Sequence, residues 1–124
     1  KGGAANVGVW WPATGDAGWT TAGDLPSRWV IHVVGPNRNR GETDRTLLTS
    51  CYRRALAVAD ELGARSIAFP LISAGAYGWP LDDAALAAVD TLRSTATRVA
   101  EVRLVAFNRA AHDALARALA GPTG

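Results

Sequence analysis

Helical and strand-like patterns alternate through most of this chain, and that alternation is what most constrains its fold. Apolar residues recur at helical spacing over residues 44–62, 82–93 and 109–120. Between these helices lie two short, mostly apolar runs, at residues 66–69 and 101–107, that are typical of buried strands. Strands that alternate with helices predict an α/β fold, with a parallel or mixed sheet covered by helices on both faces.

Further strands are predicted before this alternating part. Residues 28–34 are rich in β-branched side chains and form a strong strand pattern. Residues 14–21 form a weaker one, because two glycines interrupt it. Residues 7–11 are apolar and end at a proline, as a short strand would. We therefore divide the chain into a lead segment, residues 1–13, and a single domain, residues 14–124.

Composition limits both the number of domains and the kind of partner. A chain of 124 residues is long enough for one domain with its own core. Its 13 Lys and Arg residues nearly balance its 11 Asp and Glu residues, which argues against nucleic acid as a partner. No apolar run is long enough to span a membrane, and no signal peptide is visible. We therefore predict a cytoplasmic protein without a membrane partner.

Few side chains suggest chemistry by themselves. Cys51 is the single cysteine, so the chain cannot form an internal disulfide, and its helical surroundings indicate a buried structural thiol. His32 lies inside a strand among apolar residues, where a hydrogen-bonded core role is the common one. His112 lies on the last helix without an evident partner. These residues predict no metal site and no catalytic group.

A loop of small residues follows the strand at residues 66–69, and it reads Ser73-Ala74-Gly75-Ala76-Tyr77-Gly78. A helical pattern begins shortly after it. Exposed backbone N–H groups and the positive end of a helix both favour a bound anion, and glycines let the backbone approach a ligand closely. In α/β folds, ligands bind at the carboxyl ends of strands. This loop and Phe107-Asn108, which end the last strand, are therefore the two candidate ligand sites.

Several stretches resemble the macro domain, an ADP-ribose-binding α/β/α module. They are TGDA at residues 14–17, LPSR at residues 25–28, WVIHVVGP at residues 29–36, SCYRRAL at residues 50–56, SIAFPLISAGAYGWP at residues 66–80 and EVRLVAF at residues 101–107. Their order and spacing run through most of the chain, and the stretch at residues 66–80 is the most specific. The branch that looks most similar is the bacterial one often called O-acetyl-ADP-ribose deacetylases, which also resembles enzymes that remove ADP-ribose from acidic side chains.

The resemblance implies a fold, a ligand and the residues that hold it. The fold would be a three-layer α/β/α sandwich around a mixed sheet. The ligand would be ADP-ribose, free or carried by a protein or metabolite, and no cofactor is implied. Backbone N–H groups would wrap its diphosphate, from the loop residues Ser73, Ala74, Gly75, Ala76, Tyr77 and Gly78. Tyr77 would lie near the distal ribose, and Phe107 would pack on the adenine with Asn108 beside it.

This chain departs from the family pattern before Thr14. The family has two strands there, an Asn-Ala-Ala-Asn segment, a Gly-rich loop with an Asp, and a helix. In related hydrolases those Asn and Asp residues orient the distal ribose and a water, so the resemblance assigns no catalytic residue to this chain. Asp82 and Asp83 are assigned to the start of a helix instead. One strand of that part would lie between two retained strands, so without it two sheet edges stay open.

Three arrangements would complete such a sheet. The segment at residues 7–11 would fill the gap, a second copy or another chain would pair there, or the natural protein has residues that this sequence lacks. Lys1 is not a natural start, which favours the third.

Four functions remain open at this point. The first is hydrolysis of ADP-ribosyl or O-acetyl-ADP-ribose esters by a full-length form, and the second is reading ADP-ribose without cleavage. The third is binding of RNA or poly-ADP-ribose, against which the near-neutral charge argues. The fourth is a remnant with a structural or assembly role.

Overall fold

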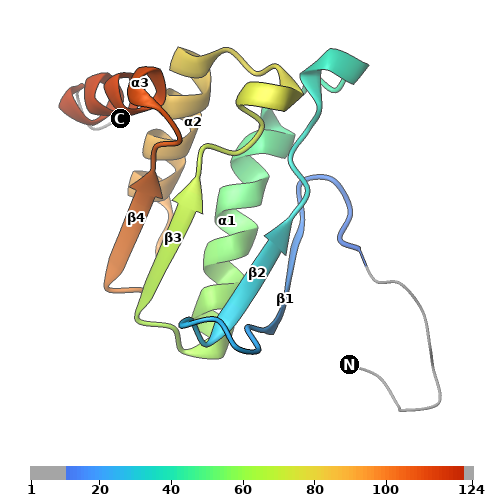
Figure 1. The fold of residues 1–124 in the computed structure, drawn as a ribbon, viewed down its shortest axis with the longest axis vertical. Coiled ribbons are helices and arrows are strands. Elements are labelled where there is room, and N and C mark those ends of the chain that lie inside the picture. Colours follow the sequence, from blue (N-terminus) through green and yellow to red (C-terminus); the bar gives the residue numbers. More distant parts are fainter. Residues whose placement is uncertain (1–10, 122–124) are drawn as a thin grey trace.

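The computed structural model describes residues 11–121, which form four strands and three α-helices (Figure 1). The strands are β1 (Ala17–Thr21), β2 (Trp29–Val33), β3 (Ser66–Pro70) and β4 (Glu101–Val105), and the helices are α1 (Arg45–Leu62), α2 (Leu81–Ser94) and α3 (Arg109–Ala120). Two short 3₁₀ helices, η1 (Arg38–Arg40) and η2 (Gly75–Tyr77), lie in the connecting loops. The predicted alternation of helices and strands after Gly35 is confirmed. The strand predicted at residues 7–11 lies, apart from Trp11, outside the described residues.

The strands form two separate pairs. β1 and β2 are antiparallel, in the register that places Ala17 opposite Val33. β3 and β4 are parallel, with Ser66 opposite Glu101. β2 and β3 run in the same direction side by side (Figure 1), yet no hydrogen-bonded ladder joins them. One pair is antiparallel and the other parallel, so the strands are mixed as predicted. The facing edges of β2 and β3 are the two open edges that the sequence predicted.

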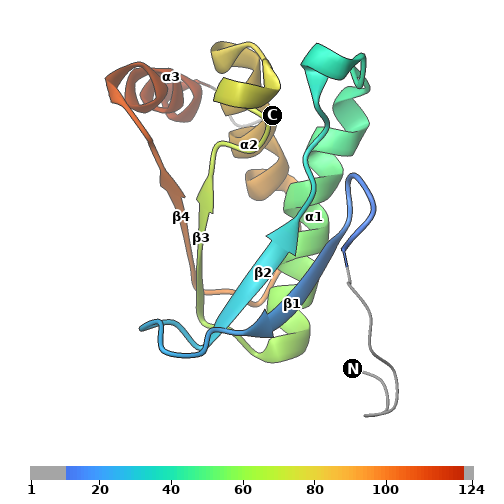
Figure 2. The ribbon, with the colours of Figure 1, turned by 45° about the vertical axis from the view of Figure 1, so that its right-hand side comes forward.

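Two of the helices cover one face of these strands. Both views show α1 and α2 on the same side of the strand layer, with α3 beside α2 (Figures 1 and 2). The sequence favoured helices on both faces, and among residues 11–121 the second face carries none. One of the three expected layers is thus not built by the described residues. No helix in this range is long and apolar enough to cross a membrane.

Local signals fix the ends of α1, and its apolar face forms the core. The side chain of Asp44 accepts a hydrogen bond from the Thr46 amide at the first turn, and Gly63 ends the helix with a φ of 71°. The residues that α1 turns inward are fully buried, Leu48 and Leu56 among them. Four fully buried alanines of α2 allow close approach to the neighbouring helices, at positions Ala84, Ala85, Ala87 and Ala88.

Candidate functional site

The loop at residues 73–78, called the 73–78 loop below, is a tightly wound turn at the carboxyl end of β3. Ser73, Gly75 and Gly78 have φ angles of 66°, 71° and 78°, in the left-handed region that favours glycine. The Gly78 amide donates to the Gly75 carbonyl at 2.9 Å, which closes η2. The amides of Gly75 and Ala76 open this 3₁₀ turn, where N–H groups have no partner within the helix, and no described residue accepts from them. The loop thus presents donors that suit an anion.

Asn39 braces this loop from the η1 segment. Its Nδ2 donates to the Ala76 carbonyl at 3.0 Å. A Cβ on Gly78 would lie 2.6 Å from Cγ of Asn39, so any other residue here would displace the Asn39 side chain. Glycine at position 78 therefore serves two purposes, a left-handed turn and the close approach of Asn39. From the sequence, Gly78 was expected to let the backbone bend and approach a ligand closely, and its contact with Asn39 was not predicted.

Tyr52 hydrogen-bonds the backbone just before the loop, a role that the sequence did not indicate. It is fully buried in α1. Its hydroxyl accepts a hydrogen bond from the Ile72 amide at 3.0 Å and reaches the Pro70 carbonyl at 3.4 Å. Its ring lies 5.2 Å from that of Phe69, centroid to centroid. Burial raises the pKa of Tyr52, so the hydroxyl stays protonated and can hold both backbone groups.

Phe107 lies beside the loop, as its place at the end of a parallel strand predicts, and Asn108 follows it at the start of α3. A Cβ on Gly75 would be 3.9 Å from Cζ of Phe107, so the ring flanks the turn. Phe107 is 56% exposed and Tyr77 is 40% exposed, so both rings are accessible. The side-chain oxygen of Asn108 caps α3 by accepting from the Ala111 amide at 2.8 Å.

The two carboxylates at the start of α2 are both paired. Asp83 accepts hydrogen bonds from Nε1 of Trp79 at 2.9 Å and from Nε of Arg45 at 3.1 Å. Burial by itself would raise the pKa of Asp83, but these bonds and the charge of Arg45 together hold it below its ordinary value. Asp82 pairs with Arg117 at 2.7 Å. Both lie in the first turn of α2, as the helix-start interpretation requires.

The other candidate groups are placed for structure. His32 hydrogen-bonds Thr20 across the β1–β2 pair at 2.9 Å. Cys51 is buried, contacts the Val34 carbonyl at 3.3 Å, and has its pKa raised by burial to about 11, so its thiol is not activated. The hydroxyl of Ser73 is buried without a hydrogen-bond partner among the described residues, so no base activates it. Residues 11–121 contain no group of three or more His, Cys, Asp or Glu side chains that could hold a metal.

The sequence of the chain matches a known family. The model of the Macro domain family matches residues 10–88, more than half of the chain. The chain belongs to the macro domain family. A macro domain-containing protein of Streptomyces coelicolor is 56% identical over 106 residues, which are 86% of this chain and 63% of that protein. One from Methanosarcina mazei is 39% identical over 110 residues, 86% of this chain and 59% of that protein.

Solved macrodomains share the fold and carry related ligands. The macrodomain of Oceanobacillus iheyensis with ADP superposes with a TM-score of 0.78 at 34% identity, over 86% of this chain and 58% of that chain. The Trypanosoma brucei macrodomain in complex with ADP-ribose gives 0.76 at 29% identity, over 86% of this chain and 46% of that one. These likenesses confirm the predicted α/β macro domain fold. This chain also spans less than two thirds of the length of the relatives that it matches.

Proposed function

We propose that this chain binds ADP-ribose through the 73–78 loop and Phe107. The observation that supports this most directly is how near the two lie: the exposed ring of Phe107 is beside a turn whose amides at Gly75 and Ala76 are unpaired. A diphosphate needs several N–H donors and an adenine needs an aromatic face. ADP-ribose carries both groups. In this arrangement Tyr77 lies at the distal ribose and Asn108 beside the base.

Calorimetry with ADP-ribose tests this binding. We expect saturable heat with ADP-ribose and none with ribose 5-phosphate, which has neither the adenine nor the second phosphate. Gly75→Glu should abolish the heat, because the new carboxylate would repel the diphosphate and its bulk would enter the space beside Phe107.

Gly23→Glu is the matched control for that variant. Gly23 also has a left-handed φ, 61°, with nothing within 4 Å of its Cβ position, and it lies in the turn between β1 and β2. The control carries the same added charge and similar backbone strain away from the loop, so it should retain full affinity. Unchanged affinity in Gly75→Glu, or no heat at millimolar ADP-ribose in the parent chain, would refute the site.

For a longer protein that also carries the family's Asn and Asp segment, we propose hydrolysis of ADP-ribosyl or O-acetyl-ADP-ribose esters. In this chain Asp82 and Asp83 form ion pairs and the Ser73 hydroxyl has no base. The chain should therefore bind mono-ADP-ribosylated protein without releasing ADP-ribose. Turnover by this chain alone would contradict that assignment. The second candidate function is a module that recognises ADP-ribose without cleaving it, and the ion pairs of Asp82 and Asp83 favour it.

A further inference from the structure

Trp79 closes the 73–78 loop and ties it to the start of α2. Its backbone amide donates to the Ser73 carbonyl at 3.0 Å, so one hydrogen bond joins the two ends of the loop. The Trp79 side chain is buried, and its indole Nε1 donates to Oδ2 of Asp83 at 2.9 Å. A buried indole N–H needs a hydrogen-bond acceptor, and Asp83 supplies it. The residue that closes the loop is therefore fixed through its side chain by a carboxylate of α2.

Arg45 holds that carboxylate from a distant part of the sequence. Nε of Arg45 lies 3.1 Å from each oxygen of Asp83, and the two residues are 38 positions apart. Arg45 is the first residue of α1, so this ion pair ties the start of α1 to the first turn of α2. A charge-assisted hydrogen bond restricts the carboxylate to orientations in which Oδ2 can accept from Trp79. Arg45 is thus connected to the loop through two intermediate residues, Asp83 and Trp79.

We propose that Arg45 and Asp83 are positioning residues, which hold Trp79 and thereby keep the 73–78 loop in the conformation that binds ADP-ribose. Neither residue has to touch the ligand for this role. When only a fraction of the molecules has the competent loop, the apparent dissociation constant rises in inverse proportion to that fraction. Loss of a contact in this series should therefore weaken binding while the fold persists. This inference rests on the proposed function, because it assigns a role within the same site.

Two simpler roles for Arg45 lead to different expectations. An ordinary surface ion pair would change neither the loop nor the affinity, because exposed pairs contribute little. A direct partner of the diphosphate would attract the ligand whether or not Trp79 is held in place. Only the positioning role makes the effect of Arg45 depend on the indole of Trp79.

The test is a double-mutant cycle with Arg45→Gln and Trp79→Phe. Trp79→Phe keeps an aromatic ring and removes the N–H that reaches Asp83. Calorimetry should show that ADP-ribose binds about 3- to 10-fold more weakly to Trp79→Phe and about 2- to 5-fold more weakly to Arg45→Gln. In the double variant, Arg45→Gln should add no further loss. Urea unfolding in parallel should show that each variant is folded under the conditions of the calorimetry.

Hydrogen exchange in the ligand-free protein provides a second measurement. The amide at position 79 donates to Ser73, so its exchange reports how often the loop opens. This amide should exchange about 2- to 5-fold faster in Arg45→Gln than in the parent, the range expected for the loss of an exposed ion pair.

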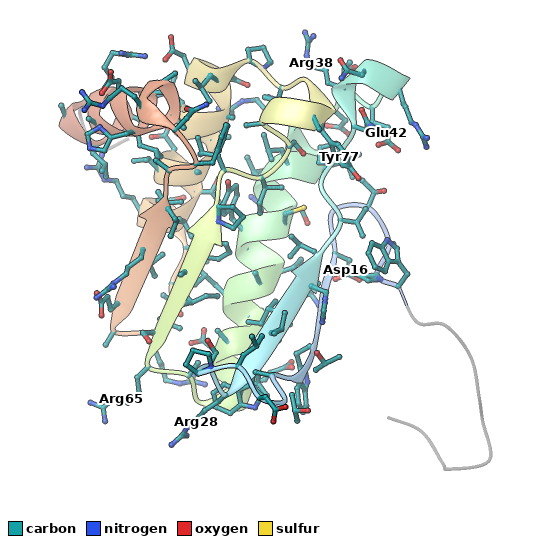
Figure 3. All side chains as sticks on the ribbon, in the orientation of Figure 1. Asp16, Arg28, Arg38, Glu42, Arg65 and Tyr77 are labelled. Carbon is teal, nitrogen blue, oxygen red and sulfur yellow. The ribbon has the colours of Figure 1, made fainter. Side chains whose placement is uncertain are left out.

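Arg54→Gln is the matched control for Arg45→Gln. Arg54 also lies on α1 and pairs with Asp16 at 3.2 Å, and both side chains of that pair are about as exposed as those of Arg45 and Asp83. Figure 3 shows Asp16 away from Tyr77 of the loop. The control should therefore change neither the exchange at position 79 nor the affinity for ADP-ribose.

Two results would overturn the proposal. The first is unchanged exchange at position 79 in Arg45→Gln, since the ion pair would then not hold the loop. The second is an equal loss of affinity from Arg45→Gln with and without the Trp79 indole, which would make Arg45 a direct contact of the ligand. No heat with ADP-ribose in the parent, together with faster exchange in Arg45→Gln, would instead refute the ADP-ribose site and support the control of the loop by Arg45.

Discussion

Replacement of Tyr52 by Phe should destabilise the protein by about 1–3 kcal/mol, the usual cost when a buried donor is left without an acceptor. The hydroxyl of Tyr52 is the acceptor for the Ile72 amide, which is buried. Phenylalanine keeps the ring and its contact with Phe69, so no cavity adds to this cost. The value therefore reports the hydrogen bonds of the hydroxyl, the one accepted from the Ile72 amide and the longer one donated to the Pro70 carbonyl.

Urea unfolding measures this difference. With a slope of about 1.5 kcal/mol per molar urea, the midpoint should fall by roughly 0.7–2 M. Tyr77→Phe is the matched control, because it removes the same atom from a side chain that is 40% exposed, and its free energy of unfolding should stay within about 0.5 kcal/mol of the parent. Since Ile72 directly precedes the 73–78 loop, Tyr52→Phe should also lower the affinity for ADP-ribose. Equal midpoints for the two variants would show that the Ile72 amide finds another partner, and the support assigned to Tyr52 would then be wrong.

Three further predictions follow from individual contacts. Gly35→Ala should destabilise the protein by about 1–3 kcal/mol through overpacking, because the added Cβ would lie 2.6 Å from Cγ2 of Ile72 and would collide with the Ser73 hydroxyl. Gly121→Ala is the control in the same urea assay: its Cβ would have no contact closer than 3.5 Å, so its effect should be near neutral. Asp83→Asn should be less stable than the parent at pH 7. The pKa of Asp83 is depressed in the folded protein, so the stability that its carboxylate contributes is lost as the pH falls through that folded pKa. In unfolding measured as a function of pH, the difference in stability between variant and parent should therefore shrink below about pH 4. Cys51 should resist iodoacetamide at pH 8 and react in urea, because burial raises its pKa to about 11; rapid modification of the folded protein, followed by mass spectrometry, would contradict this placement.

Structural features that depend on neighbouring residues in the sequence, such as helix ends, could be predicted. Asp44 caps α1 and Gly63 ends it, and the predicted helix at residues 44–62 differs from α1 by one residue. The helix predicted at residues 109–120 has the bounds of α3. The 73–78 loop and Phe107 were placed at neighbouring strand ends, because parallel strands bring their carboxyl ends to one edge.

Contacts between distant segments could not be predicted in this way. Asn39 reaches Ala76 across 37 positions of the sequence, and Tyr52 reaches Ile72 across 20. Neither residue is marked by a motif, and a tyrosine on a buried helix face is consistent with simple core packing. The need for a glycine at position 35 likewise depends on Ile72 and Ser73, which only the fold brings against it. Whether the proposed ligand residues bind ADP-ribose stays a prediction until it is measured.

The separation of the strands into two pairs has a consequence for how the molecule opens. β1 and β2 contact each other and α1, while β3 pairs with β4 and α2 packs on α3. Without a ladder between β2 and β3, the β1–β2 hairpin can detach without breaking any hydrogen bond of the other pair. Such sub-global openings occur at lower free energy than complete unfolding. We therefore expect the amides of β1 and β2 to exchange before those of β3 and β4, and the 73–78 loop, which follows β3 and is held by Tyr52, to stay with the part that opens later.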